Sequence, residues 1–313
     1  MGKQIETVTG PIGSEGLGIT SMHEHVPLGN ASTPEQRDDA FQYCVSELVR
    51  ARQLGLKTIV EVSPRRDAAG IKEVAEKAEM QIVVCTGFYV DLTDEEKLFS
   101  VDDYRRHMMA EIELGISGTG IRPGVIKLGA YNEKITDYER RVFTAGGLVQ
   151  RDTGLPICTH AVAGCMNQQN ILADAGADLS KVYYSHVEAE FGWEGRSLSQ
   201  QIDYLEDVVK KGSTLSYNNF GNWAHTSQAS LSEIIRAIIE RGYAEHHVAT
   251  MDLVFDYKTG HRKILWEDIN EDGPLRTYAY LLSHAVPWMS SNGVSDQDID
   301  KMIVSTPARI FGG

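Results

Sequence analysis

Two histidines separated by one residue, His23 and His25, are the side chains whose types and spacing most directly suggest chemistry. Alternate side chains of a β-strand point to the same face, so both imidazoles would project from one side of a strand while Glu24 turns away. Zinc and similar metals bind neutral imidazole at about 2.0 to 2.1 Å, and a same-face pair fits that geometry. Such pairs also occur on solvated surfaces, so a metal site requires further ligands elsewhere in the chain.

Further candidate ligands end four other predicted strands. Lys127, His160, His186 and Asp252 each close a short β-type run. Each alone has an ordinary structural explanation: a hydrogen-bonded histidine, a lysine paired with a carboxylate, or an aspartate that caps a loop. Because six such residues stand at the same end of five strands, we interpret them together as one metal centre. Its predicted ligands are His23, His25, Lys127, His160, His186 and Asp252.

Lys127 fits such a centre only in a modified form. An ammonium group among four histidines and a metal dication would be repelled, and burial in an apolar strand favours the neutral amine. A neutral amine can react with CO₂ to give a carbamate, N6-carboxylysine, whose two oxygens can bridge two metals. The predicted centre therefore holds two divalent metals: one on His23, His25 and Asp252, the other on His160 and His186, with Lys127 spanning both.

The elements that must position these residues alternate along the chain. Short runs rich in apolar, β-branched or aromatic residues predict strands at 17–23, 57–63, 81–86, 124–128, 155–159, 181–185, 213–217 and 247–251. Helical patterns are found at 34–54, 70–79, 101–114, 137–152, 165–175, 199–210, 230–241, 273–286 and 295–303. Glycines that would end helices in the left-handed conformation precede most of the later strands.

Strict alternation of strands and helices, with nearly continuous apolar strands, predicts a parallel sheet covered by helices. Eight such units in 313 residues match an α/β fold with a single (β/α)8 TIM barrel, one domain over residues 1–313. A doubly wound open sheet is the competitor, but residues 21–30 contain no G-x-G-x-x-G phosphate turn. In a barrel, the carboxyl ends of the strands form one mouth, where the candidate ligands would converge.

Composition and charge narrow the range of partners. The formal net charge of −14 argues against nucleic acid or an anionic membrane surface, although it does not exclude an anionic small-molecule substrate. No apolar run approaches about 18 residues, and the N-terminus has no apolar signal-peptide core. The four cysteines lack paired spacing and are expected to be reduced. We expect a cytoplasmic protein with a small-molecule substrate.

In their order along nearly the whole chain, these motifs resemble the phosphotriesterase-like family of the amidohydrolase superfamily, a group of binuclear metal hydrolases. The resemblance is carried by Leu17-Gly18-Ile19-Thr20 before His23-Glu24-His25, Ile126-Lys127, Gly154-Leu155-Pro156 before Thr159-His160, Ser185-His186, Asp252, and Thr306-Pro307-Ala308-Arg309-Ile310-Phe311. It implies the barrel, the metal pair and the carboxylated lysine. Zinc is the metal expected first, and manganese and cobalt also suit a mixed histidine and carboxylate site.

The predicted chemistry is hydrolysis at a carbonyl or phosphoryl centre. Two metals that share a hydroxide would provide a nucleophile at neutral pH and polarise the bond under attack. Asp252 would be the catalytic residue that takes the proton from this hydroxide, a role that the resemblance also implies.

Four side chains are candidate substrate contacts. Tyr89 resembles a tyrosine that meets the substrate in lactonase-type relatives, and Trp223 would form an aromatic wall after the seventh strand. Lys258 and Arg262 lie in the long segment 253–272, which could be a lid that holds an anionic substrate group. The ordinary alternatives stay open: Tyr89 covers the barrel rim, and the segment is a solvated charged loop.

Two classes of function remain. The first is a metal-dependent hydrolase of lactones or related carboxylic esters, with promiscuous activity on phosphotriesters. Its rivals on the same metal centre are an amidase or deacylase of small N-acyl compounds and a phosphoester hydrolase. The second class is a non-enzymatic metal-binding barrel, against which the intact ligand set argues. Relatives are often dimers, so the resemblance implies a homodimer, although no interface can be read from the sequence.

Overall fold

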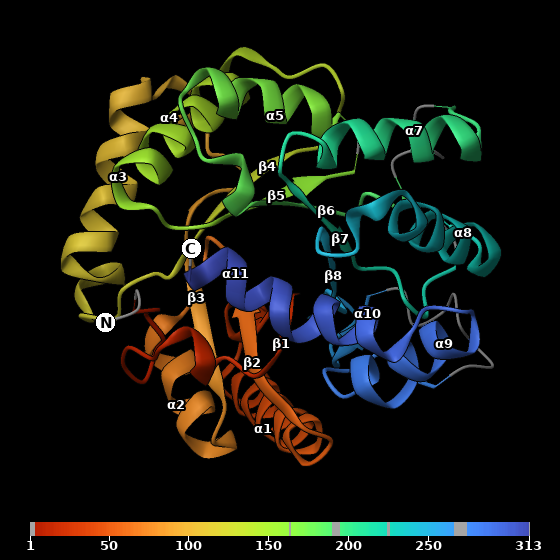
Figure 1. The fold of residues 1–313 in the computed structure, drawn as a ribbon. Helices are drawn as coiled ribbons and strands as arrows, with labels where there is room; N and C mark the ends of the chain where they lie inside the picture. Colours follow the sequence, from red (N-terminus) through yellow and green to blue (C-terminus); the bar gives the residue numbers. More distant parts are fainter. Residues whose placement is uncertain (1–3, 163, 190–194, 224–225, 266–273, 313) are drawn as a thin grey trace.

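The computed structural model describes residues 4–162, 164–189, 195–223, 226–265 and 274–312. Eight strands pair in parallel in the order β1 to β8 and curve into a barrel (Figure 1). They are β1 (Ile19–Glu24), β2 (Leu56–Glu61), β3 (Gln81–Phe88), β4 (Val125–Ala130), β5 (Ile157–Ala161), β6 (Val182–Ser185), β7 (Thr214–Tyr217) and β8 (His247–Ala249). The predicted (β/α)8 barrel is confirmed, with each strand within two residues of its expected bounds.

The seam between β1 and β8 is closed by bonds outside the regular strand ladders. His23 N–H donates to Thr250 Oγ1 at 2.9 Å, and that hydroxyl donates to His23 O at 2.6 Å. Asp252 N–H also donates to His23 O, at 3.0 Å. The bonds that close the barrel therefore bring two of the candidate ligands side by side.

Helices follow the strands and cover the outside of the barrel (Figure 1). They are α1 (Pro34–Gln53), α2 (Ala68–Ala78), α3 (Val101–Leu114), α4 (Asp137–Thr153), α5 (Cys165–Asp174), α7 (Leu198–Val209), α8 (Gln228–Ile238), α9 (Val286–Ser291), α10 (Asp296–Asp300) and α11 (Thr306–Gly312). Short 3-10 turns are η1 (Ser14–Gly16), η2 (Leu28–Asn30), η3 (Glu96–Leu98), η4 (Ile116–Gly118) and η5 (Leu179–Lys181). Capping boxes begin α3, α4 and α7, in which Ser100, Thr136 and Ser197 accept from the third helical N–H.

The C-terminal helices differ from the expected pattern. The predicted helix 295–303 continues from Asp296 to Gly312 through a π segment, η9 (Lys301–Ser305), and a similar segment, η8 (Leu281–Ala285), precedes α9. Another π segment, η6 (Ile239–Tyr243), follows α8. Pro287 lies two residues after η8, and Pro307 lies two residues after η9. Because proline has no N–H to continue a regular helix, each proline accounts for the irregular turn before it. The predicted helix 273–286 is only partly confirmed: residue 273 lies outside the described residues, residues 274–279 are not helical, and the helix instead runs through η8 and α9 to Ser291.

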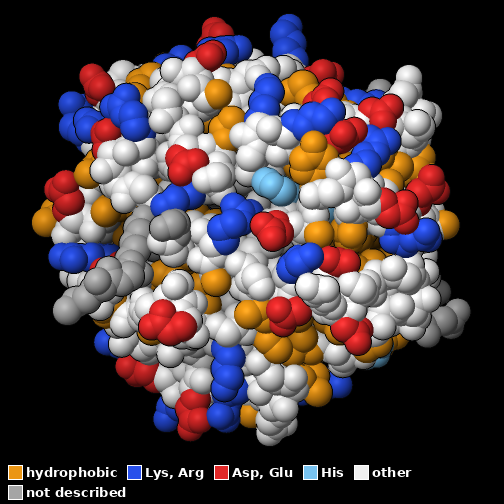
Figure 2. Space-filling model, viewed as in Figure 1, with side chains coloured by type: hydrophobic (Ala, Val, Ile, Leu, Met, Phe, Trp, Pro, Cys, Tyr) orange, Lys and Arg blue, Asp and Glu red, His pale blue; other side chains and the backbone are white. Residues whose placement is uncertain are grey.

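The barrel interior is a packed core rather than a channel. It is filled by Met22, Val60, Val83, Cys85, Val125, Cys158, Tyr183 and Val248, with Ile310 and Phe311 of α11 closing the amino end. In Figure 1, α11 lies across this end, and the same view in Figure 2 shows acidic and basic side chains interspersed over it. Only the carboxyl end of the barrel is left for a site.

Part of the segment that follows β8 forms a hairpin. Strands β9 (Phe255–Asp256) and β10 (Lys263–Ile264) pair in antiparallel fashion, and residues 266–272 of the predicted lid segment lie outside the described residues. No helix in the described part of the chain is both long and apolar enough to cross a membrane. The four cysteines are buried, and none of them forms a disulfide with another described residue.

Candidate metal centre

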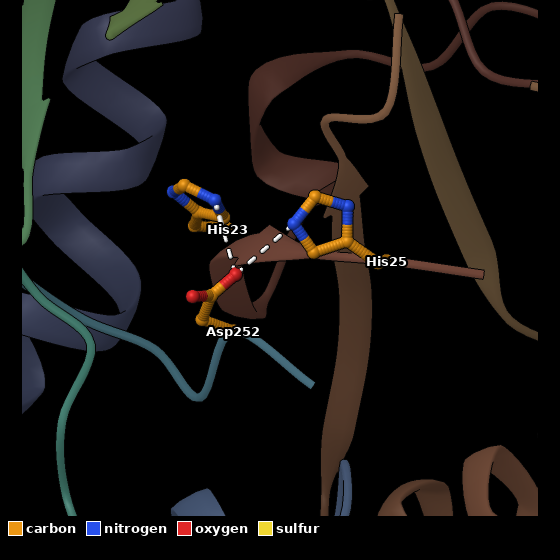
Figure 3. Close-up of side chains that lie close together, drawn as sticks. All are labelled: His23, His25 and Asp252. Carbon is orange, nitrogen blue, oxygen red and sulfur yellow. Dashed lines mark ion pairs between the residues drawn. The ribbon is translucent and has the colours of Figure 1, made fainter. Parts of the chain in front are cut away.

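Three predicted ligands meet at the carboxyl end of the barrel. The Nε2 atoms of His23 and His25 lie 3.3 and 3.0 Å from Oδ1 of Asp252. Figure 3 shows both rings directed at this carboxylate. One ligand atom from each of the three residues lies within 4.8 Å of the other two, a grouping that could hold a metal ion.

An irregularity in β1 lets His23 reach this point. Met22 packs in the barrel interior, yet the next residue, His23, also points inward, where its Nε2 lies 3.3 Å from Lys127 Nζ. Adjacent residues of a regular strand face opposite sides. The β1–β2 register shifts between Ser21 and Glu24, as in a β-bulge, and this shift re-aims the side chain.

Two serine hydroxyls hold the far sides of these imidazoles. Ser185 Oγ lies 2.7 Å from His23 Nδ1, and Ser63 Oγ lies 2.7 Å from His25 Nδ1. Hydrogen bonding at Nδ1 leaves Nε2 to face Asp252, the arrangement that metal-binding histidines usually have. Sequence reasoning gave neither serine a role, although the resemblance included Ser185 in the motif Ser185-His186; Ser63, two residues past β2, was not named.

Glu24 points away from the two histidines and holds the backbone around Asp252. Its carboxylate accepts from the N–H groups of Met251 (3.1 Å) and Leu253 (3.0 Å), and Ser21 Oγ donates to it as well. Asp252 itself has a φ of 51°, a left-handed conformation that is strained for a residue other than glycine. The bonds on both of its neighbours keep the residue in this conformation.

The other two predicted histidines form a second group beside the first. His186 has a φ of 66°, and its Nε2 lies 3.6 Å from Asp252 Oδ2, without a hydrogen-bond partner among the described residues. The His160 ring stands edge-on to His186, with their centroids 4.6 Å apart. A buried nitrogen that has no hydrogen-bond partner is an orphan that a metal would satisfy. The donor set thus fits a metal centre.

The protonation of these groups suits metal binding. Burial lowers the pKa of His186 to about 4. Burial is also the largest cause that holds the pKa values of His23 and His160 well below 6.5. The next cause is the charge of Lys127 for His23 and the neighbouring His186 for His160. Burial alone would raise the pKa of Asp252, but His23 and the bonds from His23 and His25 outweigh it and hold that pKa well below 3.8. Neutral imidazoles and an ionised carboxylate are the forms that bind metals.

Lys127 lies at the base of the centre. Its side chain is 1% exposed, and Nζ lies 3.3 Å from His23 Nε2 and 3.7 Å from Cys158 Sγ. No carboxylate oxygen of a described residue lies within 4.0 Å of Nζ, so the described chain does not provide the counter-ion of the simple ion-pair explanation.

Two tyrosines flank His160 at the rim. The rings of Tyr89 and Tyr131 both stand edge-on to it at 5.1 Å between centroids, and Tyr89 OH donates to Tyr131 OH at 3.3 Å. Tyr89 therefore lies beside the candidate ligand His160, and its contact with a substrate stays a prediction. Tyr131 was missed, although it directly follows β4 and is 44% exposed at the site.

The other three predicted substrate contacts lie in the segments that follow β7 and β8. Trp223 lines a cavity of about 270 Å³ whose walls also include Phe220, Tyr280 and Trp288. Lys258 is 87% exposed and pairs with Asp256. Arg262 pairs with Asp39 and lies over the Tyr43 ring. Among the described residues, neither cation forms an ion pair or hydrogen bond with a candidate ligand, so their role in substrate binding stays a prediction.

Comparison with known proteins gives a consistent result. Residues 3–311 match the model of the phosphotriesterase family. A phosphotriesterase homology protein of Mycobacterium tuberculosis is 28% identical, with 98% of this chain and 97% of that protein covered. An N-acetyltaurine hydrolase of Tetraodon nigroviridis is 27% identical, with 97% and 96% covered. A solved structure of a mutant of an organophosphorus hydrolase superposes with a TM-score of 0.85 at 26% identity, over 99% of this chain and 97% of that one.

Proposed function

Because the chain belongs to the phosphotriesterase family, we propose that it is a binuclear metal-dependent hydrolase that acts on a lactone or a related carboxylic ester. At the coarser level the chain is a hydrolase of this metal-dependent family, since its relatives include an N-acetyltaurine hydrolase and an organophosphorus hydrolase. The number of metals, the substrate and the roles of individual residues are the parts that we propose.

The observation that carries the proposal is the convergence of two Nε2 atoms on Asp252 Oδ1, with His186 Nε2 beside the other carboxylate oxygen. His23, His25 and Asp252 would hold one metal, and His160 and His186 the other. Divalent metals held there would supply Lewis-acid polarisation of the scissile bond and lower the pKa of a coordinated water.

Lys127 would join the two metal positions as a carbamate. Its buried amine has no carboxylate partner within the described structure, and an unpaired buried ammonium is unfavourable. The neutral amine adds to CO₂, forming an N–C bond and releasing one proton to solvent. The product carries a negative charge, which would attract the divalent metals that an ammonium group would repel.

Asp252 would accept the proton that hydrolysis releases. Its side chain is 24% exposed, whereas His23 is 1% exposed, so the carboxylate has the better contact with solvent. Oδ1 faces His23 and His25, and Oδ2 lies on the side of His186. Oδ2 would therefore be the oxygen that takes up a proton and passes it to water.

The rim supports a substrate with an apolar portion. Tyr89 and Tyr131 would pack against the ester or lactone group near His160. The cavity of about 270 Å³ lined by Phe220, Trp223 and Trp288 would take its apolar substituent. Cleavage of a small N-acyl amide is the second candidate, favoured by the likeness to an N-acetyltaurine hydrolase. Slow hydrolysis of phosphotriesters is a further expectation, in line with the organophosphorus hydrolase neighbour.

A substrate screen tests the proposal. Protein reconstituted with zinc, manganese or cobalt is assayed against lactones, N-acyl amino acids and amino sulfonates, and phosphate triesters, and kcat/KM values are compared. Lactones should exceed the other classes by at least about tenfold, equal to about 1.4 kcal/mol of transition-state preference. A higher kcat/KM for an N-acyl amide than for the lactones would favour the second candidate function over ester hydrolysis. Metal analysis should give two ions per chain, and loss of turnover in Asp252→Asn tests the proton acceptor.

A further inference from the structure

A buried arginine beside the metal centre ties together two loops of the barrel mouth. Arg276 is 8% exposed. Its Nε donates to Phe220 O at 2.9 Å, and its Nη2 donates to Asn218 O at 2.7 Å and to Met251 O. Two of these carbonyls belong to the segment after β7 and the third lies just after β8. One guanidinium thus joins loops that no strand pairing connects.

The N–H groups of the same two segments are held by buried carboxylates. Glu188 Oε1 accepts from the N–H groups of Asn218 (2.6 Å) and Asn219 (2.7 Å). Glu24 does the same for Met251 and Leu253, on either side of Asp252. Each segment is therefore fixed from both sides, by a carboxylate at its N–H groups and by Arg276 at its carbonyls.

The charges explain why an arginine is suited to this place. The guanidinium interacts electrostatically with Asp252, Glu24 and Glu188, which offset part of the cost of its burial. Its planar group carries five N–H donors and reaches three carbonyls at once, whereas a lysine ammonium is a point charge on a flexible stem. A lysine in this position would leave at least one of the three carbonyls unpaired.

We propose that Arg276 is a positioning residue that couples the segment at 218–220, next to the aromatic cavity, to the candidate ligand Asp252. By holding Met251 O, the guanidinium keeps Asp252, the next residue, in its strained left-handed conformation. Movement of the 218–220 segment on substrate binding is then transmitted to the carboxylate. The kinetic part of this inference rests on the proposed function; the structural part does not.

Arg309 provides a matched control. It also donates to three acceptors: Ser180 O at 3.0 Å, Glu245 O at 3.0 Å and Thr214 Oγ1 at 3.1 Å. Its helix, α11, closes the opposite end of the barrel. Arg309→Lys therefore removes the same kind of backbone tie far from the candidate metal centre.

The test compares Arg276→Lys with Arg309→Lys in full-length, metal-loaded protein. Hydrogen exchange of segments 217–222 and 250–254 should rise at least about tenfold in Arg276→Lys only, with zinc affinity, measured by chelator competition, at least about tenfold weaker. With an active substrate in hand, kcat should fall more than KM rises. Exchange and zinc affinity within twofold of those of Arg309→Lys would overturn the inference. If the wild type cleaves none of the substrates, the exchange and affinity results still decide it.

A measurement on the wild type covers the case in which Arg276→Lys does not fold. Coupling through one guanidinium requires the amides of Asn218, Asn219, Met251 and Leu253 to open together. Their exchange rates, corrected for intrinsic rates, should agree within about threefold and rise in parallel with denaturant. Rates in the two segments that differ by a hundredfold or more would refute the coupling.

Discussion

Replacing Glu24 by glutamine tests how the chain holds Asp252 in position. In the wild type, Glu24 Oε1 accepts from Met251 N–H and Oε2 accepts from Leu253 N–H. Glutamine keeps the shape of the side chain but changes one of these oxygens to an NH₂ group. A donor then faces a donor beside a residue whose φ is 51°.

The size of the effect follows from these contacts. A hydrogen bond to a charged group contributes about 1.5 to 3 kcal/mol, and a buried N–H left without a partner costs about 1 to 3 kcal/mol. The lost hydrogen bond and the unpaired N–H are two descriptions of the same contact, so the two ranges are not added in full. We therefore expect a loss of about 3 kcal/mol in the free energy of unfolding. For a domain of this size that corresponds to a fall in Tm of roughly 6 °C. Zinc affinity should fall as well, since Asp252 is released.

Glu61 provides the control for the same substitution. It stands directly opposite Glu24 in the β1–β2 register and is also fully buried. Its Oε1 accepts from Ser63 N–H at 3.1 Å, but its Oε2 has no hydrogen-bond partner among the described residues. The NH₂ group of Glu61→Gln can occupy the Oε2 position without the loss of a hydrogen bond, and removal of a buried negative charge offsets the cost of the new unpaired donor, so the expected change in stability is below about 1 kcal/mol.

The assay is urea unfolding of metal-free protein, followed by zinc titration against a chelator. Metal-free conditions separate the backbone effect from the loss of bound metal. Equal losses in Glu24→Gln and Glu61→Gln, or unchanged stability and zinc affinity in Glu24→Gln, would show that Glu24 does not hold Asp252.

Three further predictions concern the centre and the core. Ser185→Ala removes the hydroxyl 2.7 Å from His23 Nδ1 and should weaken zinc binding about 10- to 100-fold; unchanged affinity in chelator competition would contradict this. Protein loaded with metal in ¹³C-labelled bicarbonate should show a carbamate signal by NMR that is absent in Lys127→Met; the same signal in both would exclude Lys127 as its source. Burial lowers the pKa of His247 to about 3, whereas an unfolded histidine has a pKa of about 6.5. The unfolded chain therefore binds more protons between these values, and stability falls as the pH drops below about 6.5. Urea midpoints between pH 7 and 5 should show that His247→Phe removes about 1 kcal/mol per pH unit of this dependence, averaged over the range; an unchanged slope would mean that His247 is not buried as neutral imidazole.

Much of the fold could be predicted because each strand and helix carries its own local signal. The β-type runs, the capping residues and the helix-ending glycines are all readable within a few residues; Gly154, for example, ends α4 with a φ of 67°. The candidate ligands could be found for the same reason. A polar residue such as His160 or Asp252 at the end of an apolar run is visible without knowing what it faces.

Features that depend on contacts between distant segments could not be predicted. The register shift that turns His23 inward, the left-handed conformations of His186 and Asp252, and the three carbonyls around Arg276 are all set by tertiary packing. Neither does sequence pattern reveal that Lys258 and Arg262 have acidic partners of their own, Asp256 and Asp39. Pairing of this kind depends on where a hairpin lies against its neighbours.

The seam between β1 and β8 has a consequence for how the protein is made. Ser21 and Glu24 bond to residues up to 229 positions later in the chain, across the seam next to the candidate ligands. Contacts of such long sequence separation form late, because the loop that they close is large. On the ribosome, His23 and His25 emerge long before Asp252 exists. A nascent chain without Asp252 would therefore offer a metal its histidines alone, and the complete set of candidate ligands would come together only when the barrel closes.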